Sequence, residues 1–301
     1  MDAYPLKHIK SKYILKHVAD NIKKNKFLKI IKYNKLIQKK LDIDLYDYKN
    51  YYEEIEIELI PIMKEFQNFF INIREGIWHY YHIYFNDNEK EIKRNYFTKK
   101  DNVSKIKIII DNEIKSFKKL FYNCKCISKI KFIKFIRNDI FDMHNMFSEC
   151  SSLEELNLNN FNTSYVIDMS FMFYKCSSLK ELNLNNFNTI NVTNMSSMFE
   201  GCSSLKELNL NNFNTNNVTN MSSMFFECSL LKKLNINNFN TINVIDMRSM
   251  FEGCISLKEL NLNNFNTNNV INMCFMFMRC SKELKTEIRN KYKFIMNEAF
   301  D

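Results

Sequence analysis

The chain has 301 residues, a formal net charge of +9 and 46% hydrophobic residues, so it can bury a sizeable core in one elongated domain or in two. Only three glycines and two prolines occur, which excludes the glycine-rich phosphate loops of nucleotide-binding proteins. No segment approaches the ~18 consecutive apolar residues of a membrane span, and the N-terminus lacks the apolar run of a secretory signal. We therefore expect a soluble, intracellular protein, with the cell surface as the alternative location.

Residues 1–52 form a basic segment that holds 13 Lys against 5 Asp and no Glu, and so carries nearly the whole net charge. Apolar residues recur there at helical spacing, as at Ile14, Leu15 and Val18, which predicts two or three short amphipathic helices. Their basic face could contact nucleic acid or an acidic membrane surface. The plainer interpretation is a solvated, lysine-rich face.

Part of this segment, residues 11–41 (SKYILKHVADNIKKNKFLKIIKYNKLIQKKL), also resembles an F-box, a module of small packed helices. It lacks the Leu-Pro start that is typical of that family, unless Pro5 and Leu6 stand in for it. The resemblance implies that residues 1–52 bind a ubiquitin-ligase adaptor while the rest of the chain holds a substrate.

Residues 53–102 predict a small mixed β and α cap or adaptor. Apolar residues alternate with glutamates over 55–59, which predicts a half-buried strand that Pro61 should end. A second alternation over 81–85 predicts another strand, followed by a turn at Asn86. A short helix is expected over 89–96, and Trp78 is expected to join the core.

From about residue 103 the sequence repeats every 26 residues, most clearly in 202–227. A fixed period of this length is typical of stacked repeats. Leu205, Leu208 and Leu210 follow the L-x-x-L-x-L spacing that opens a leucine-rich repeat, with the last two on the buried face of a short strand. We predict a mixed α/β repeat fold, a leucine-rich-repeat solenoid of about seven parallel strands over 103–280. The strands should start near Val103, Ile127, Leu153, Leu179, Leu205, Leu231 and Leu257.

The units strongly resemble BspA-like leucine-rich repeats, which occur in bacterial surface proteins and in protists. The resemblance rests on the string N-F-N-T-x-x-V-x-x-M-x-x-M-F-x-x-C-x-x-L, as in residues 212–231. The generic repeat places Asn or Cys eight residues after the first Leu, whereas this chain has Phe there, as at Phe213. The resemblance implies a protein-binding repeat domain, and its bacterial members suggest surface adhesion as an alternative function.

Turns in such a fold need residues that tolerate left-handed backbone, and the scarcity of glycine predicts that Asn takes those positions. Seven of the nine cysteines form one column at the repeat period, from Cys124 to Cys280. Stacking would align their side chains in parallel, which disfavours disulfides, so we expect a ladder of buried free thiols. Zinc is not expected because no C-x-x-C pair occurs.

The outward positions of the strands form polar rows along the array, and we take them as the candidate partner-binding face. They could bind a protein or peptide, or they could only satisfy each other and water, since stacked Asn rows can hydrogen-bond along the stack. The candidate residues are Glu155, Asn157, Asn159, Glu181, Asn183, Asn185, Glu207, Asn209, Asn211, Lys233, Asn235, Asn237, Glu259, Asn261 and Asn263.

Residues 281–301 break the repeat pattern, and apolar residues recur there every three to four positions from Leu284 to Ile295. Ser281 is a plausible N-cap, so we predict a C-terminal helix that caps the last strand. His79 and His82 could share a helix face as metal ligands, but a third ligand is missing from the sequence around them. We expect no cofactor, no metal and no catalytic site, and predict a monomeric, non-catalytic interaction protein.

Overall fold

The computed structural model describes residues 15, 31, 34–42, 53–63 and 68–301. The chain divides into two compact units, residues 1–54 and 55–301. In the first unit, helix α4 (Lys35–Leu41) begins at Asn34, whose Oδ1 accepts a hydrogen bond from the backbone N–H of Ile37 at 3.1 Å. It ends at Asp42 in a left-handed conformation. Most of the predicted F-box-like segment lies outside the described residues.

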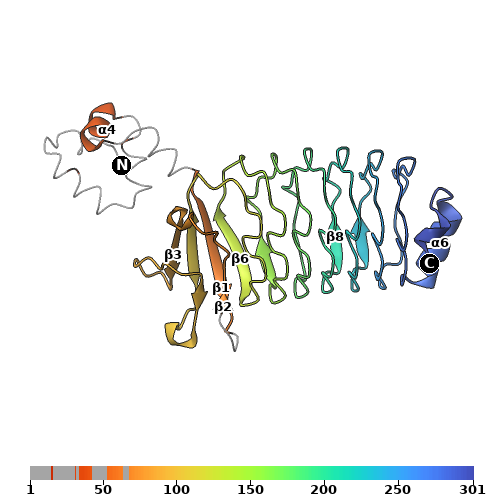
Figure 1. Ribbon diagram of the computed structural model, residues 1–301, viewed down its shortest axis with the longest axis horizontal. Helices are drawn as coiled ribbons and strands as arrows, with labels where there is room; N and C mark the ends of the chain where they lie inside the picture. Colours follow the sequence, from red (N-terminus) through yellow and green to blue (C-terminus); the bar gives the residue numbers. More distant parts are fainter. Residues whose placement is uncertain (1–14, 16–30, 32–33, 43–52, 64–67) are drawn as a thin grey trace. The chain divides into compact units, whose positions relative to one another are not determined.

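The second unit begins with a sheet of five strands in the order β3-β5-β1-β6-β7 (Figure 1). Strand β5 pairs antiparallel with β1 and β3, and β1 pairs antiparallel with β6. Every second residue of β1 and β3 is buried, as the alternation over 55–59 and 81–85 predicted. The strands are β1 (Ile55–Pro61), β3 (Tyr81–Phe85), β5 (Ile106–Ile110), β6 (Ile127–Lys134) and β7 (Glu155–Asn157).

The N-terminal part of this unit also contains short elements. Strand β2 (Asn68–Phe69) pairs with β4 (Tyr96–Phe97), and the 3-10 turns are η1 (Trp78–Tyr80) and η2 (Lys99–Asp101). The helix predicted over 89–96 is absent. That prediction was wrong because the stretch is held against its neighbours instead: Ile92 donates its N–H to the carbonyl of Ile83 at 2.7 Å, and Arg94 pairs with Asp101.

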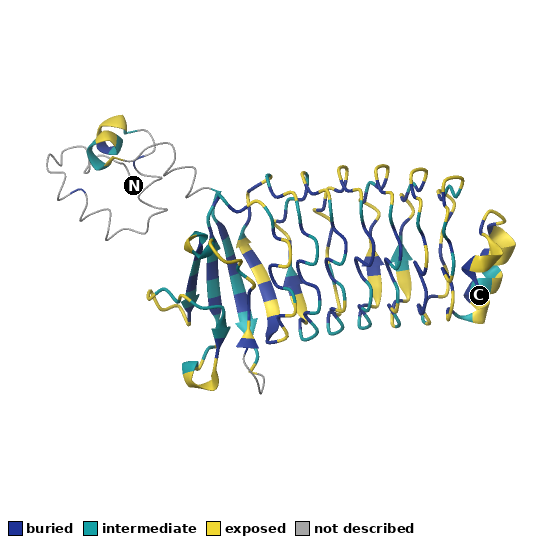
Figure 2. Cartoon of the chain, viewed as in Figure 1, coloured by how far each residue is buried: buried dark blue, intermediate teal, exposed yellow. Residues whose placement is uncertain are grey.

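The 26-residue repeats follow one another towards the C-terminus, and their apolar columns are buried along the inside of the array (Figure 2). One column of phenylalanines, from Phe121 to Phe277, stacks ring on ring with neighbouring centroids 5.5 to 5.7 Å apart. The cysteine column is buried and free, as expected, and its thiols from Cys150 onwards donate to backbone carbonyls, as Cys202 does to Phe173 at 3.1 Å. Burial raises the pKa of Cys202 to about 12.

The predicted solenoid of about seven parallel strands is not confirmed. The expected first strand near Val103 is β5, which is antiparallel to its neighbours. Within the repeats, β6 pairs in parallel with β7, and β8 (Glu207–Asn209) with β9 (Lys233–Asn235), while the Leu179 and Leu257 repeats have no regular strand at these positions.

Continuous pairing between repeats lies on the opposite side of each unit, in a stretch we call the return limb (residues 141–150 in one repeat, and its equivalents at 26-residue spacing). Isolated parallel bridges connect this limb from Ser116 through to Asn272. Each junction between neighbouring limbs carries four backbone hydrogen bonds of 2.6 to 3.2 Å, for example from Phe147 N–H to the carbonyl of Met172. The methionine and phenylalanine columns therefore stack through a regular backbone ladder.

Two positions in every return limb have left-handed backbone, which leucine-rich columns alone did not reveal. The prediction that Asn takes these positions was largely wrong, because only Asn123 and Asn145 do so in the limbs. The other occupants are Lys119, Glu149, Phe171, Lys175, Ser197, Gly201, Ser223, Glu227, Ser249, Gly253, Phe275 and Arg279. For most non-glycine residues, left-handed backbone costs about 1 kcal/mol or more in conformational free energy. The hydrogen bonds of the ladder hold these residues in that conformation despite the cost.

Buried threonines close the turn that follows each Asn-Phe-Asn triplet. Thr215 Oγ1 donates to the carbonyl of Asn240 in the next repeat at 2.8 Å and accepts that residue's N–H at 2.8 Å. Thr163, Thr189 and Thr241 make the same pair of bonds with the following repeats. A hydroxyl can donate and accept at once, which explains why threonine suits this position.

The chain ends with helix α6 (Lys282–Lys291) and the 3-10 turn η3 (Asn297–Ala299). Ser281 caps α6 as predicted, since its side chain accepts the N–H of Leu284 at 3.1 Å. Leu284 and Ile288 are the buried residues of the helix. Beyond it, Phe300 stacks on Phe277 at 5.4 Å and so adds one ring to the column.

Candidate functional site

The outward side of β8, β9 and the equivalent segments forms the candidate face. Leucines and polar residues alternate along these segments, and the leucines turn inward because only one side of a strand can face the core. Glu207 and Asn209 are exposed, whereas Leu208 between them is 3% exposed. Leu182 and Leu234 are less covered than Leu208 and pack at the margin of the core.

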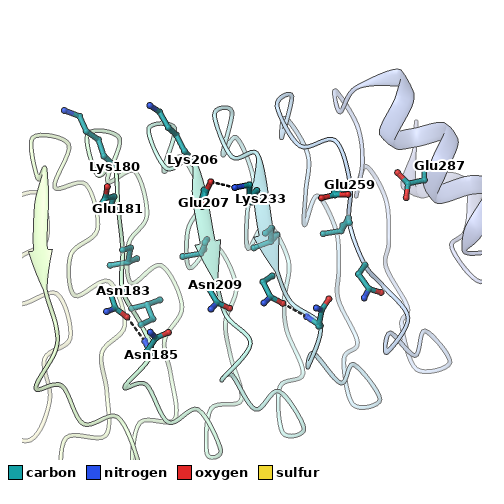
Figure 3. Close-up of a pocket in the computed structure, with 18 of the residues that line it drawn as sticks. Lys180, Glu181, Asn183, Asn185, Lys206, Glu207, Asn209, Lys233, Glu259 and Glu287 are labelled. Carbon is teal, nitrogen blue, oxygen red and sulfur yellow. Dashed lines mark hydrogen bonds and ion pairs between the residues drawn. The ribbon is translucent and has the colours of Figure 1, made fainter.

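This face is hollowed into an open groove of ≈ 1090 Å³, shown in Figure 3. Four consecutive repeats line it, and α6 adds Glu287 and Lys291 at its C-terminal end. The leucines of the repeats form the floor. A second hollow of ≈ 720 Å³ continues on the N-terminal side, where β1, β6 and β7 line it, and shares Lys180, Glu181 and Asn183 with the first.

The groove combines both signs of charge. Four lysines and four glutamates line it, so the lining residues balance in formal charge: Lys180, Lys206, Lys233 and Lys291, and Glu181, Glu207, Glu259 and Glu287. Lys233 Nζ lies 2.7 Å from Glu207 Oε1, and this hydrogen bond raises the pKa of the lysine. Both side chains are well exposed, so the pair contributes little to stability and remains available to a partner.

The asparagines of the face hold the turn that ends each strand. Asn209 Oδ1 accepts the N–H of Asn211 at 3.1 Å, and the same bond recurs at 3.0 to 3.3 Å in the other repeats. The predicted hydrogen-bonding of these rows along the stack is therefore replaced by local bonds. Axial bonds come instead from the next asparagine, as when Asn238 Nδ2 donates to the carbonyl of Asn211 at 2.6 Å.

The two hollows bring together all the candidate residues except Asn211 and Asn263, which lie outside both linings. Sequence reasoning missed two contributions. Lys180 and Lys206 directly precede the glutamate row, so the repeat alignment could have included them. Glu287 and Lys291 reach the groove only because α6 packs beside the last repeats, which periodicity cannot show.

A serine, a histidine and an aspartate meet on the return limb. His144 Nδ1 lies 2.6 Å from Ser170 Oγ, which donates to Asp168 Oδ1 at 2.6 Å. Ser170 is 1% exposed, and the next repeat has the equivalent bond from Ser196 Oγ to the side-chain Oδ1 of Asn194 without any histidine. The repetition identifies a structural turn rather than a nucleophile.

His79 and His82 do not share a helix. His82 belongs to β3, and its two ring nitrogens lie 3.1 Å from Glu91 Oε1 and 3.4 Å from Asp111 Oδ2. Within the part of the chain that the structure describes, no group of three His, Cys, Asp or Glu side chains is arranged to hold a metal ion. No helix in the same part combines the length and apolar character that spanning a bilayer requires.

Comparison with known proteins places the repeats in context. A family model described as "Mycoplasma protein of unknown function, DUF285" matches residues 115–229 and 202–294, which together make up more than half of the chain. The matched region contains the repeats on which the BspA-like resemblance rests and none of residues 1–52, so it gives no support to the F-box-like prediction. No curated protein matches the chain.

The solved structures include a crystal structure of a leucine-rich-repeat protein of T. pallidum that is similar to this chain. The sequences are 20% identical, the match covers 59% of this chain and 76% of that chain, and the TM-score is 0.38.

Proposed function

Because this chain belongs to the family described as Mycoplasma proteins of unknown function, DUF285, and the matched region is its repeat array, we propose that it is a non-catalytic interaction scaffold. The partner is a protein or peptide segment that lies in the groove beside α6. The observation that carries this proposal is the groove itself, an open hollow of ≈ 1090 Å³ that four repeats and one helix line together.

The chemistry of the groove favours an extended polypeptide. Each repeat offers carboxamides that can both donate and accept hydrogen bonds, which suits the alternating N–H and C=O groups of an extended backbone. The margins of Leu182 and Leu234 on the floor provide small apolar contacts between the polar rows. The lysines and glutamates of the groove would favour a partner whose charged side chains lie opposite residues of the other sign, which also fixes its register in the groove.

The direct test compares two exchanges of asparagine for arginine in the full chain. Asn209 lies in the groove, while Asn268 is an exposed asparagine at a turn and outside both hollows. A partner that is isolated from native lysate with the wild type should be lost with Asn209→Arg and retained with Asn268→Arg. Retention by both variants would place the binding site elsewhere, and loss by both would show that the variants act through folding.

Unfolding of each variant is followed by circular dichroism as a control. Asn268→Arg should unfold within about 0.5 kcal/mol of the wild type, because its side chain is exposed. Asn209→Arg also removes the bond between Asn209 Oδ1 and the N–H of Asn211, so it should lose about 1 kcal/mol. A lost partner in a variant that is still fully folded under the conditions of the binding assay then assigns the effect to the groove.

A further inference from the structure

Most of the backbone bonds between return limbs point the same way. At each of the six junctions, four N–H groups of one repeat donate to four carbonyls of the next, as from Ser223 to Arg248 at 2.8 Å and from Phe225 to Met250 at 2.9 Å. One bond at the edge of each limb runs in reverse, as from Ile271 to Ile245. Four bonds against one leave a net direction, with N–H groups facing the C-terminal end of the array.

Left-handed backbone occurs at two positions of each limb, four residues apart, and the polarity itself is set by which groups of the limb donate and which accept. Every second residue of a limb donates its N–H to the next repeat, and the residues between them accept bonds from the preceding repeat through their carbonyls. Peptide dipoles that line up across seven limbs reinforce one another, as they do along a helix. The last repeat therefore ends the array with a row of N–H groups and a partial positive charge.

The residues at the two ends of the ladder match this polarity. At the first limb, Asn72 supplies donors: its N–H bonds to the carbonyl of Leu120 at 2.8 Å, and its Nδ2 bonds to that of Tyr122 at 2.7 Å. One repeat later, the equivalent carbonyls are those of Met146 and Ser148, and they accept bonds from N–H groups of the preceding limb. Asn72 therefore takes the place of a preceding limb.

At the last limb the chain's C-terminal segment supplies acceptors. Glu298 Oε1 accepts the N–H of Met273 at 3.2 Å, and the Glu298 carbonyl accepts that of Phe275 at 2.9 Å. The carbonyl of Ala299 accepts the N–H of Phe277 at 2.6 Å. The segment thus occupies the place of a further limb, with a carboxylate added.

We propose that the backbone N–H of Met273, at the positive end of the ladder, is an anion-binding position, and that the Glu298 carboxylate is its resident ligand. The ligand class is an oxyanion, either a carboxylate or a phosphate. The site does not depend on the proposed groove, since it lies on the return limb and is formed by main-chain atoms.

The guanidinium of Arg289 could also attract an added anion. Arg289 Cζ lies over the ring of Phe300, 4.3 Å from the ring centroid. Arg289 Nη2 lies 3.9 Å from Asp301 Oδ1. An anion drawn to this guanidinium would not report on the N–H row. The experiment therefore includes a variant without Arg289.

The test is chemical rescue in the full chain, read as amide hydrogen exchange of Met273. Glu298→Ala removes the carboxylate and should speed exchange roughly two- to five-fold, the range expected for one charge at the end of a dipole array. Acetate should restore the protection, whereas chloride at equal ionic strength should not. Glu298→Gln keeps an acceptor oxygen and should lie between the wild type and Glu298→Ala.

The controls decide between the outcomes. Glu283→Ala removes an exposed glutamate from the first turn of α6 and should leave both the exchange and its response to acetate unchanged. Rescue of Glu298→Ala should persist when Arg289→Ala is added. Equal effects of acetate and chloride, unchanged exchange in Glu298→Ala, or rescue that disappears with Arg289 would each overturn the proposal.

Discussion

Replacing Thr215 with valine removes one hydroxyl from the buried threonine column while nearly preserving the shape of the side chain. Thr215 is 1% exposed, and its Oγ1 makes two hydrogen bonds of 2.8 Å, one to the carbonyl and one to the N–H of Asn240. Each bond of this kind contributes about 1 kcal/mol net, and a backbone group left unpaired costs about 1–3 kcal/mol. Because Asn240 is only half-buried, water can reach part of its N–H and carbonyl once the hydroxyl is removed. We expect a loss of about 2 kcal/mol in the free energy of unfolding.

Urea unfolding of Thr215→Val measures this loss, and amide exchange of Asn240 locates it. The matched control is Thr219→Val, because Thr219 is exposed and its hydroxyl makes a single bond of 3.3 Å to the carbonyl of Thr193. The control should change stability by less than about 0.5 kcal/mol. If Thr215→Val is no more destabilising than Thr219→Val, the threonine column is not a stabilising link between repeats.

Three further predictions concern strain, thiol reactivity and acid stability. Ser223→Gly removes a side chain from a left-handed position and should raise the free energy of unfolding by about 1 kcal/mol, whereas Ser223→Ala should not; urea titration distinguishes them. Of the nine cysteines only Cys274 is partly exposed, so a thiol-specific dye should react quickly with one thiol in the native protein and with none in Cys274→Ala. The hydrogen bond from Arg94 lowers the pKa of Asp101 from 3.8 to about 2. This stabilisation is present above pH 4 and is lost as the pH falls towards 2, so Asp101→Asn should flatten the decline of stability in that range; an unchanged decline would contradict the ion pair's role.

Much of the repeat core could be predicted from the sequence, because burial follows the local spacing of apolar residues. The columns of Leu205, Phe213 and Met221 are buried as that spacing requires. The prediction of a helix over 89–96 failed because the backbone N–H of Ile92 bonds to β3 and the side chain of Arg94 bonds to Asp101. The seven-strand prediction failed because leucine spacing reports which side chains face inward and does not report how backbones pair.

The candidate face was predictable to the same extent. Exposed rows such as Asn183 and Asn209 follow from alternation along each strand, and so does their position opposite the leucines. The groove required the third dimension, because Glu287 comes from a helix whose docking position no repeat encodes. The actual bonds of the asparagines also required it, since a local turn and an axial ladder are equally compatible with one Asn per repeat.

The sequence by itself determined the 26-residue period, the inward columns, the free buried thiols and the polar face, since each depends on which residue types recur at fixed spacing. Only the tertiary structure decided that pairing is continuous on the return limb, that most of the hydrogen bonds at each junction point one way, and that Asn72 and Glu298 meet its two ends. The physical reason is that these bonds join residues about one repeat or more apart, where backbone conformation and register, rather than side-chain polarity, select the partner.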